Sequence, residues 1–292
     1  MAIDSYSRRG RVRESKEELQ ERIRLEKLYQ LLTDEKEIKD KTRLAGFKPH
    51  SFQIAFLASN AKGRLLAAGN QSGKTTIGAV EVAHYALGEH PRRRIRVPNK
   101  GVIVTALSFK DGIEKIIVPK LRQVVGSDDI VRVLHNSAGM ATTIYWRTGS
   151  VTHLMSAEQD DLTFEGDTFD YFWIDEPVRR QIYIGLSRGL MKSNGRWWMT
   201  ATLLEEPWVT EEIYEPGLTG EDSNIHVFEG TTDDNVHLGE DEKKDFYRKL
   251  TPDEIQTRRY GRPSSLRGRV FKCFNPAHNK VASFDIPSHW PV

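Results

Sequence analysis

The chain has 292 residues, of which 38% are apolar and 29% charged, a composition typical of a globular protein with a sizeable core. Its 43 Lys and Arg against 41 Asp and Glu give a net charge of +2, which by itself does not indicate a nucleic-acid binder. The single cysteine, Cys273, excludes an internal disulfide, and without a long apolar run or an apolar leader we expect a cytosolic protein with no membrane span.

Residues 14–40 contain neither Gly nor Pro, and their apolar side chains recur at roughly helical spacing: Leu19, Ile23, Leu25, Leu28, Leu31 and Leu32. This pattern predicts an amphipathic helix or a pair of helices. We expect it to pack against its own domain, and docking onto a partner is the alternative. Basic clusters at residues 8–13, 92–96 and 258–272 could follow phosphates, but solvated loops are the simpler interpretation.

Beyond residue 46, short β-rich apolar runs alternate with helical patterns. The predicted strands are residues 64–69, 101–107, 142–146, 151–155, 171–175, 197–202 and 225–230, and the predicted helices are 75–87, 109–125 and 178–192. Such alternation indicates an α/β domain with a mostly parallel central sheet flanked by helices. Strands 142–146 and 151–155 are close enough to form a β-hairpin.

The composition changes near residue 216, where a turn-rich stretch precedes a charged helix at 240–249 and a short helix that ends at Gly261. We therefore divide the chain into an N-terminal charged helical arm (1–45), a core (46–215), a small lid or linker subdomain (216–270) and a terminal linker (271–292).

The strongest chemical signal lies between the strand 64–69 and the helix 75–87. The sequence there is GNQSGKTT: Gly69, Asn70, Gln71, Ser72, Gly73, Lys74, Thr75 and Thr76. Glycines let successive backbone N–H groups point at phosphates, and the helix N-terminus adds its positive dipole. Lys74 is expected to pair with the β- and γ-phosphates of ATP, and Thr75 to hold Mg²⁺. The general pattern would place its first glycine at position 68, where this chain has Ala68.

A second signal is the apolar strand at 171–175, which ends in Asp175 and is followed by Glu176. Ligands of open α/β sheets bind at the carboxyl ends of the strands. Asp175 is therefore expected to bind Mg²⁺ together with Thr75, and Glu176 to orient and polarise the attacking water.

Two weaker signals accompany these. The strand at 197–202 ends in Thr200, Ala201 and Thr202, whose hydroxyl groups could sense the γ-phosphate and couple its loss to motion. Gln53 precedes the phosphate loop, and its amide can both donate to and accept from the edge of adenine.

These elements, in this order, resemble the N-terminal ATPase domain of bacteriophage large terminases, which carry an adenine-contacting Gln, an AGNQxGKT-type loop, an Asp-Glu strand and a Thr-Ala-Thr coupling motif. The resemblance covers residues 46–292 and implies a RecA/ASCE-like P-loop NTPase with a C-terminal lid. It implies ATP hydrolysis that drives double-stranded DNA into a procapsid, with a portal protein and a small terminase subunit as partners. The protein would work in the host cytoplasm, as a monomer in solution and as a homo-oligomeric ring on the portal.

The chain departs from the terminase pattern in two places. Where several terminases place an arginine finger, the sequence reads Phe164, Glu165 and Gly166, so the finger is expected among Arg147, Arg179, Arg180 and Arg188. We favour Arg188 as the catalytic arginine because it lies between the Asp-Glu strand and Thr200. No Asp or Glu follows Asp285, so we expect no nuclease activity of the kind that the family carries in its second domain.

Two other functions are compatible with the phosphate loop. A cellular helicase or translocase would need a second RecA-like domain, for which the roughly 90 residues after residue 202 are too few. A nucleotide-binding adaptor without hydrolysis is disfavoured by the presence of both Lys74 and Glu176.

Overall fold

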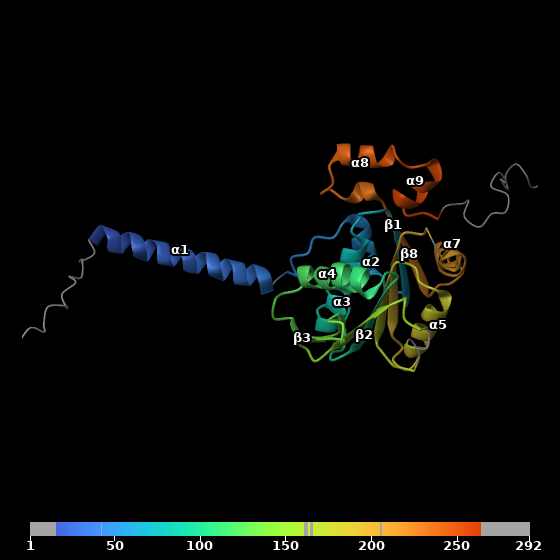
Figure 1. The fold of residues 1–292 in the computed structure, drawn as a ribbon, viewed down its shortest axis with the longest axis horizontal. Helices are drawn as coiled ribbons and strands as arrows, with labels where there is room; N and C mark the ends of the chain where they lie inside the picture. Colours follow the sequence, from blue (N-terminus) through green and yellow to red (C-terminus); the bar gives the residue numbers. More distant parts are fainter. Residues whose placement is uncertain (1–15, 42, 161–162, 164–165, 205, 264–292) are drawn as a thin grey trace, which may run out of the picture.

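The computed structural model describes residues 16–41, 43–160, 163, 166–204 and 206–263. An eight-stranded sheet runs through its centre in the order β3-β4-β5-β2-β6-β7-β1-β8 (Figure 1). The strands are β1 Gly63–Ala68, β2 Lys100–Thr105, β3 Ile130–His135, β4 Ala141–Trp146, β5 Val151–Ser156, β6 Tyr171–Asp175, β7 Arg196–Ala201 and β8 Ile225–Gly230. All neighbours from β5 to β8 pair in parallel, and β3, β4 and β5 pair antiparallel. The predicted mostly parallel α/β sheet is therefore confirmed, as is the β4–β5 hairpin.

Helices cover both faces of this sheet. They are α1 Lys16–Lys41, α2 Ser51–Ala58, α3 Lys74–Leu87, α4 Val118–Val124, α5 Arg180–Gly189, α6 Pro207–Val209, α7 Glu215–Thr219, α8 Glu240–Tyr247 and α9 Pro252–Arg258. Two π-helical segments, Phe109–Ile117 and Thr210–Tyr214, lead into α4 and α7, and a 3₁₀ turn spans Thr232–Asp234. The predicted helix at 109–125 is thus a π-helix continued by α4. Among the described residues, no helix is both long and apolar enough to cross a membrane.

The strands are buried on both faces because successive side chains point to opposite sides of the sheet. In β6, Trp173 packs with α2, α3 and α4, whereas its neighbours Phe172 and Ile174 pack with α5 and the segment after α6. This two-sided burial accounts for the nearly continuous apolar runs that made the central strands recognisable in the sequence. The strand β3 was not predicted, because it is a half-exposed edge strand that carries Arg132 and His135.

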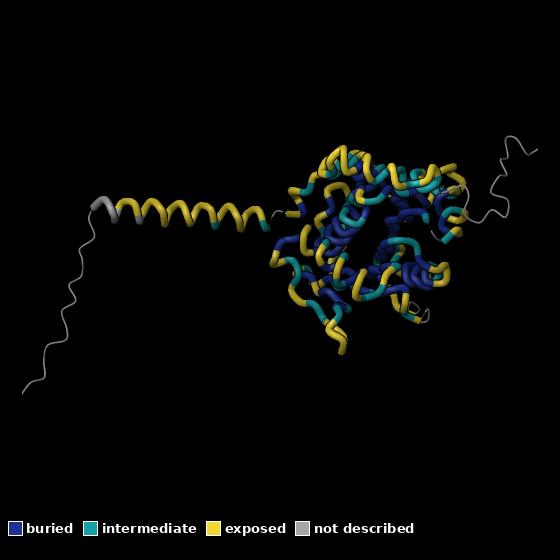
Figure 2. Tube along the Cα trace, turned by 45° about the horizontal axis from the view of Figure 1, so that its top comes forward, coloured by how far each residue is buried: buried dark blue, intermediate teal, exposed yellow. Residues whose placement is uncertain are grey.

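Two expectations about the domain boundaries are wrong. β8 pairs along its whole length with β1, so residues up to Gly230 belong to the core sheet rather than to a lid that begins at 216. The helix α1 does not pack on its own domain: it projects from the body, and its described side chains are almost all exposed (Figures 1 and 2). The basic cluster at 8–13 and the predicted linker 271–292 lie outside the described residues.

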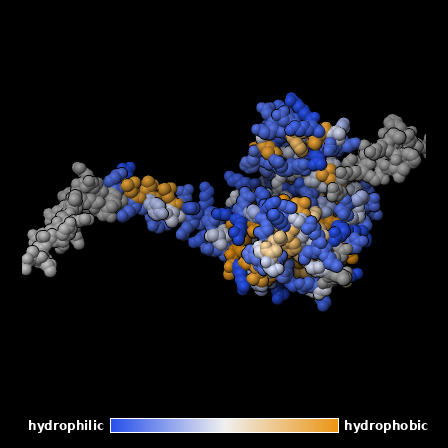
Figure 3. All heavy atoms as spheres, in the orientation of Figure 1, coloured by the Kyte–Doolittle hydropathy of each residue, from blue (hydrophilic) through white to orange (hydrophobic). Residues whose placement is uncertain are grey.

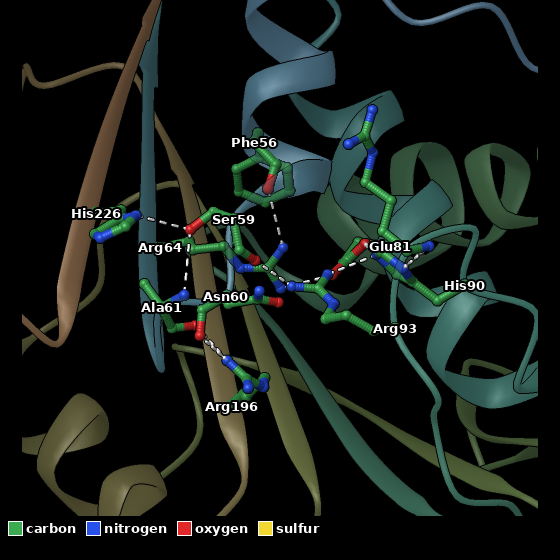
Figure 4. A network of polar contacts seen from close by, with 11 residues as sticks. Phe56, Ser59, Asn60, Ala61, Arg64, Glu81, His90, Arg93, Arg196 and His226 are labelled. Atoms are coloured by element: carbon green, nitrogen blue, oxygen red, sulfur yellow. Dashed lines mark hydrogen bonds and ion pairs between the residues drawn. The ribbon is translucent and has the colours of Figure 1, made fainter.

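A buried ionic cluster joins β1 to α3 (Figure 4). Arg64 and Glu81 are fully buried and lie 2.6 Å apart between Nη2 and Oε1, and Arg93 and His90 approach the same carboxylate. Arg64 also donates to the carbonyl of Phe56 and lies over its ring. Burial by itself would raise the pKa of Glu81, but Arg64, His90 and Arg93 outweigh it and lower the pKa to about 2. Arg93, from the basic cluster at 92–96, is therefore a structural ion-pair partner.

Glu81→Gln should lower the free energy of unfolding by about 3–5 kcal/mol at pH 7, because it leaves buried arginines without a counter-charge. The folded pKa of Glu81 lies below its ordinary value of 4.5. Its stabilising contribution is therefore present above that value and is lost as the pH falls towards the folded pKa. Urea unfolding at a series of pH values measures both effects, and Glu221→Gln on an exposed loop is the control. A wild-type stability that the substitution leaves unchanged at pH 7 would contradict this role.

Candidate functional site

The phosphate-loop sequence and the Asp-Glu strand meet at one edge of the sheet. β1 and β6 are separated only by β7, and all three run in the same direction, so the residues after each strand come together. Lys74 Nζ lies 3.1 Å from Glu176 Oε1, with the lysine side chain largely buried and the glutamate side chain one-third exposed. The structure therefore places the predicted lysine beside the predicted base.

The loop between β1 and α3 has the conformation that phosphate binding requires. Gly73 has φ +90° and Gln71 has φ +56°, so the backbone folds back before α3 begins. Lys74, Thr75 and Thr76 follow as the first residues of α3, where backbone N–H groups lack helical partners. The arrangement offers an anion a set of backbone donors together with the ammonium group of Lys74.

The departure at Ala68 has a local physical reason. A Cβ atom on Gly69 would lie 2.3 Å from the carbonyl oxygen of Arg259 and 2.8 Å from that of Arg258, both at the end of α9. Asn70 N–H donates to Arg258 O at 2.7 Å, and Thr232 Oγ1 donates to Asn70 O at 2.8 Å. Glycine is thus needed at 69, where the segment after β8 approaches the loop. Gly69 and Asn70 contact this segment with their backbone.

Asp175 is held by two hydroxyl groups. Thr75 Oγ1 donates to its Oδ1 at 3.1 Å, and Thr200 Oγ1 donates to the same oxygen at 2.8 Å. Trp173 Nε1 in turn donates to Thr200 Oγ1 at 2.9 Å, which fixes the hydroxyl group from the core side. Burial, and next the charge of Glu176, raise the pKa of Asp175 to about 6. A cation at this position would therefore stabilise the ionised carboxylate.

Thr202 holds the carboxylate of Glu176. Its backbone N–H donates to Glu176 Oε2 at 2.7 Å, and its Oγ1 donates to Oε1 at 3.2 Å. Glu176 itself has φ +65°, an unfavourable conformation for a residue with a side chain. Its N–H donates to Thr200 O at 2.8 Å, which keeps β6 and β7 paired through this strained residue. Ala201 lies within β7, in register with Ala67 of β1.

A cavity of about 510 Å³ opens beside the loop. The predicted residues that line it are Gln53, Gln71, Gly73, Lys74, Thr75 and Thr76, and the sequence analysis missed the others: Phe47, Lys48, His50, Lys120, Gln123, Asn235 and His237. No carboxylate is among these lining residues, so the cavity suits an anionic ligand. The buried Ser72 is not among the lining residues.

Gln53 connects α2 to the phosphate loop. Its Oε1 accepts from His50 N–H at 2.9 Å, and its Nε2 donates to Gly73 O at 3.2 Å. The side chain is buried at the wall of the cavity, where one amide hydrogen and one acceptor lone pair remain. The predicted contact with adenine stays a prediction.

Lys120 could not be recognised in the sequence because it belongs to no motif. It reaches the cavity since α4 packs beside α3, as both helices contribute to one side of the core. An excess of lysine around a cavity without carboxylates becomes visible only when the three walls are assembled.

The four candidate arginines lie away from this cavity. Arg147 pairs with Asp129 and Glu89, and Arg180 pairs with Glu212. Arg179 donates to the carbonyl of Gln159. Arg188 is exposed near the end of α5, whose Gly189 accepts from Phe169 N–H just before β6 begins. Arg188 is therefore at the opposite edge of the sheet from its own Lys74, and cannot act as a catalytic arginine in the same chain. Residues 164 and 165 lie outside the described part.

A family model described as the terminase large subunit, T4likevirus-type, N-terminal, matches residues 65–276. The chain belongs to this terminase family. No curated protein matches it in sequence.

Solved terminase structures share its fold. The Thermus phage P74-26 large terminase ATPase domain has 20% identity and a TM-score of 0.54, over 75% of this chain and 95% of that one. A large terminase from a thermophilic bacteriophage has 15% identity and a TM-score of 0.59, over 73% of this chain and 53% of that one. The same thermophilic-phage protein in complex with ADP has 16% identity and a TM-score of 0.57, over 72% and 52% of the two chains. This terminase chain thus spans about half the length of the thermophilic-phage protein.

Gly69→Ala should displace α9 from the phosphate loop and lower the free energy of unfolding by about 1–3 kcal/mol, because its Cβ would overlap two carbonyl oxygens. Proteolysis of the segment 231–263 should accelerate in parallel. Thr232→Val removes hydrogen bonds from the same contact. The double variant should therefore lose less stability than the two single losses combined. Full additivity, or an unchanged rate of proteolysis, would refute the close approach.

Proposed function

We propose that this terminase chain binds ATP in the cavity at the phosphate loop and hydrolyses it as the motor domain of a DNA-packaging machine. The observation that carries the proposal is the ion pair between Lys74 and Glu176 at the carboxyl edge of the sheet. Membership of the terminase family supports packaging over the helicase alternative. The thermophilic-phage relative has been solved with ADP and with ATP-γ-S, which supports a nucleotide as the ligand.

The ligand-free geometry suggests how the site is switched on. A γ-phosphate would attract Lys74 away from Glu176, because its charge is closer to the donors of the loop. Glu176 would then keep its two bonds from Thr202, while the oxygen that faced Lys74 becomes available to accept from water. In this state Glu176 orients the attacking water in line with the bond to the leaving ADP. Thr202 is thereby proposed as the link between the catalytic base and the rest of β7.

The residues present fit a Mg²⁺ ion. Thr75 Oγ1 and Asp175 Oδ1 lie 3.1 Å apart and are both oxygen ligands, which Mg²⁺ prefers. No group of three His, Cys, Asp or Glu side chains suited to a metal occurs in the described part of the chain, so the nucleotide and water would supply the remaining ligands. When bound, Mg²⁺ would neutralise the phosphate charge that develops during transfer.

The assembly follows from the family by proposal. We propose double-stranded DNA, a portal protein and a small terminase subunit as partners, in the host cytoplasm and on the procapsid. Because Arg188 lies at the edge opposite to its own phosphate loop, it could serve only the loop of a neighbouring copy in a ring. The described arginines of the cluster at 258–272 are paired within the chain: Arg258 with Glu254, Arg259 with Asp233 and Arg262 with Glu229.

Glu176→Gln should lower ATP turnover by about 10²–10⁴-fold while ATP still binds, because the amide cannot accept the proton of the attacking water. Steady-state phosphate release and equilibrium binding of a fluorescent ATP analogue measure the two properties. The matched control is Glu158→Gln, an exposed glutamate in the connection before β6. Equal turnover by wild type and Glu176→Gln would remove Glu176 as the base.

Lys120→Ala should raise KM for ATP by about 3- to 10-fold and leave kcat unchanged, since the partly exposed ammonium group attracts the nucleotide from the α4 wall and does not touch the reacting bond. Lys115→Ala is the control, because this lysine lies in the same helical segment, exposed and paired with Asp111. A fall in kcat, or an unchanged KM, would show that Lys120 does not act as a binding residue.

A further inference from the structure

The helix α1 carries a short apolar face that nothing in the described chain covers. Leu25, Leu28, Tyr29 and Leu32 expose between 51% and 74% of their surface, and we refer to these four as the α1 stripe. Figure 2 shows α1 exposed over its described length, and Figure 3 shows apolar surface on it, far from the body. Four large apolar side chains at adjacent positions are costly to leave in water.

The spacing places these four side chains on one side of the helix. They follow the intervals i, i+3, i+4 and i+7, which lie on a single helical face. The same face continues by one turn to Glu21 on the N-terminal side and to Lys36 on the C-terminal side, with Lys39 one step further. The α1 stripe therefore has an acidic end and a basic end.

The base of α1 is fixed to the body. Asp40 Oδ2 accepts from Ser127 N–H at 2.8 Å and from Ser127 Oγ at 2.7 Å. Arg43, just past the helix, donates to Arg122 O at 3.1 Å and pairs with Asp40. The centre of the α1 stripe lies about 12 residues before this anchor, roughly 18 Å along the helix. The body of the same chain therefore leaves the α1 stripe free for another molecule.

We infer that the α1 stripe pairs with the α1 stripe of a second copy of this chain, with the two helices antiparallel. In that orientation Glu21 of each copy lies opposite Lys36 of the other, so two attractive contacts flank the apolar centre. A parallel pair would place Glu21 against Glu21 and Lys36 against Lys36, which is repulsive. The antiparallel pair also keeps the two bodies at opposite ends of the helices.

This pairing is independent of the proposed ATP hydrolysis. It is an isologous contact, in which the same surface of both copies meets across a two-fold axis, and it closes at two chains. A ring on a portal needs a different, head-to-tail contact. The α1 pair is therefore a two-chain association that the protein makes through its arm, without the surfaces around the phosphate loop.

Sedimentation velocity of the whole chain over a range of concentrations tests the pairing. The monomer mass is 33.4 kDa, and we expect a reversible shift to twice that mass. Leu28→Gln should abolish the shift, and circular dichroism should confirm that α1 stays helical in the variant. Leu218→Gln, at an equally exposed leucine on α7, is the control and should leave the dimer intact.

A charge exchange tests the orientation. Glu21→Lys and Lys36→Glu should each weaken dimerisation by about tenfold, because each turns two attractive contacts into repulsive ones. The double variant should restore wild-type affinity, which a parallel pair does not predict. A chain that is monomeric at all concentrations, a dimer that survives Leu28→Gln, or a double variant that stays weak would each overturn the inference. ATP turnover per chain should be equal in all these variants, so a failure of hydrolysis would be seen separately.

Discussion

The ion pair between Lys74 and Glu176 is the contact on which the architecture of the site depends. It requires the carboxyl ends of β1 and β6 to lie at one edge with only β7 between them, and the parallel order of the sheet provides this. It also requires Glu176 to be held from behind, which Thr202 at the end of β7 does with its backbone and its hydroxyl group. A single strand thus separates the two charged residues and positions one of them.

The site stores unfavourable interactions that the core offsets. Glu176 has a positive φ, and burial raises the pKa of Asp175, so both carboxyl groups of the Asp-Glu pair lie in costly environments. The helix that begins with Lys74 is held two turns later by the buried contact of Glu81 with Arg64. Trp173 packs against the same helix at Gly78 and also fixes Thr200. Rigid support of this kind keeps strained groups in position until a ligand relieves them.

The sequence was sufficient where a residue type and its spacing have one physical meaning. A glycine-rich loop between a strand and a helix, and an apolar strand that ends in Asp175, predicted both the central sheet and the edge that carries the site. It was insufficient where the reason is a contact between distant segments. Neither the ion pair of Arg64 with Glu81, nor the approach of α9 that requires Gly69, nor the entry of Lys120 into the cavity leaves a local pattern. The exposed α1 was misjudged because periodicity shows that a helix has an apolar face, but not what covers it.

A crystal structure of the wild-type chain with Mg²⁺ and a non-hydrolysable ATP analogue would test the central claim most directly. The account predicts that the triphosphate lies on the backbone N–H groups of residues 73–76, with Lys74 Nζ turned from Glu176 to the phosphates and Thr202 still bonded to Glu176. A nucleotide bound elsewhere, or a Lys74–Glu176 pair that persists beside a bound triphosphate, would contradict it.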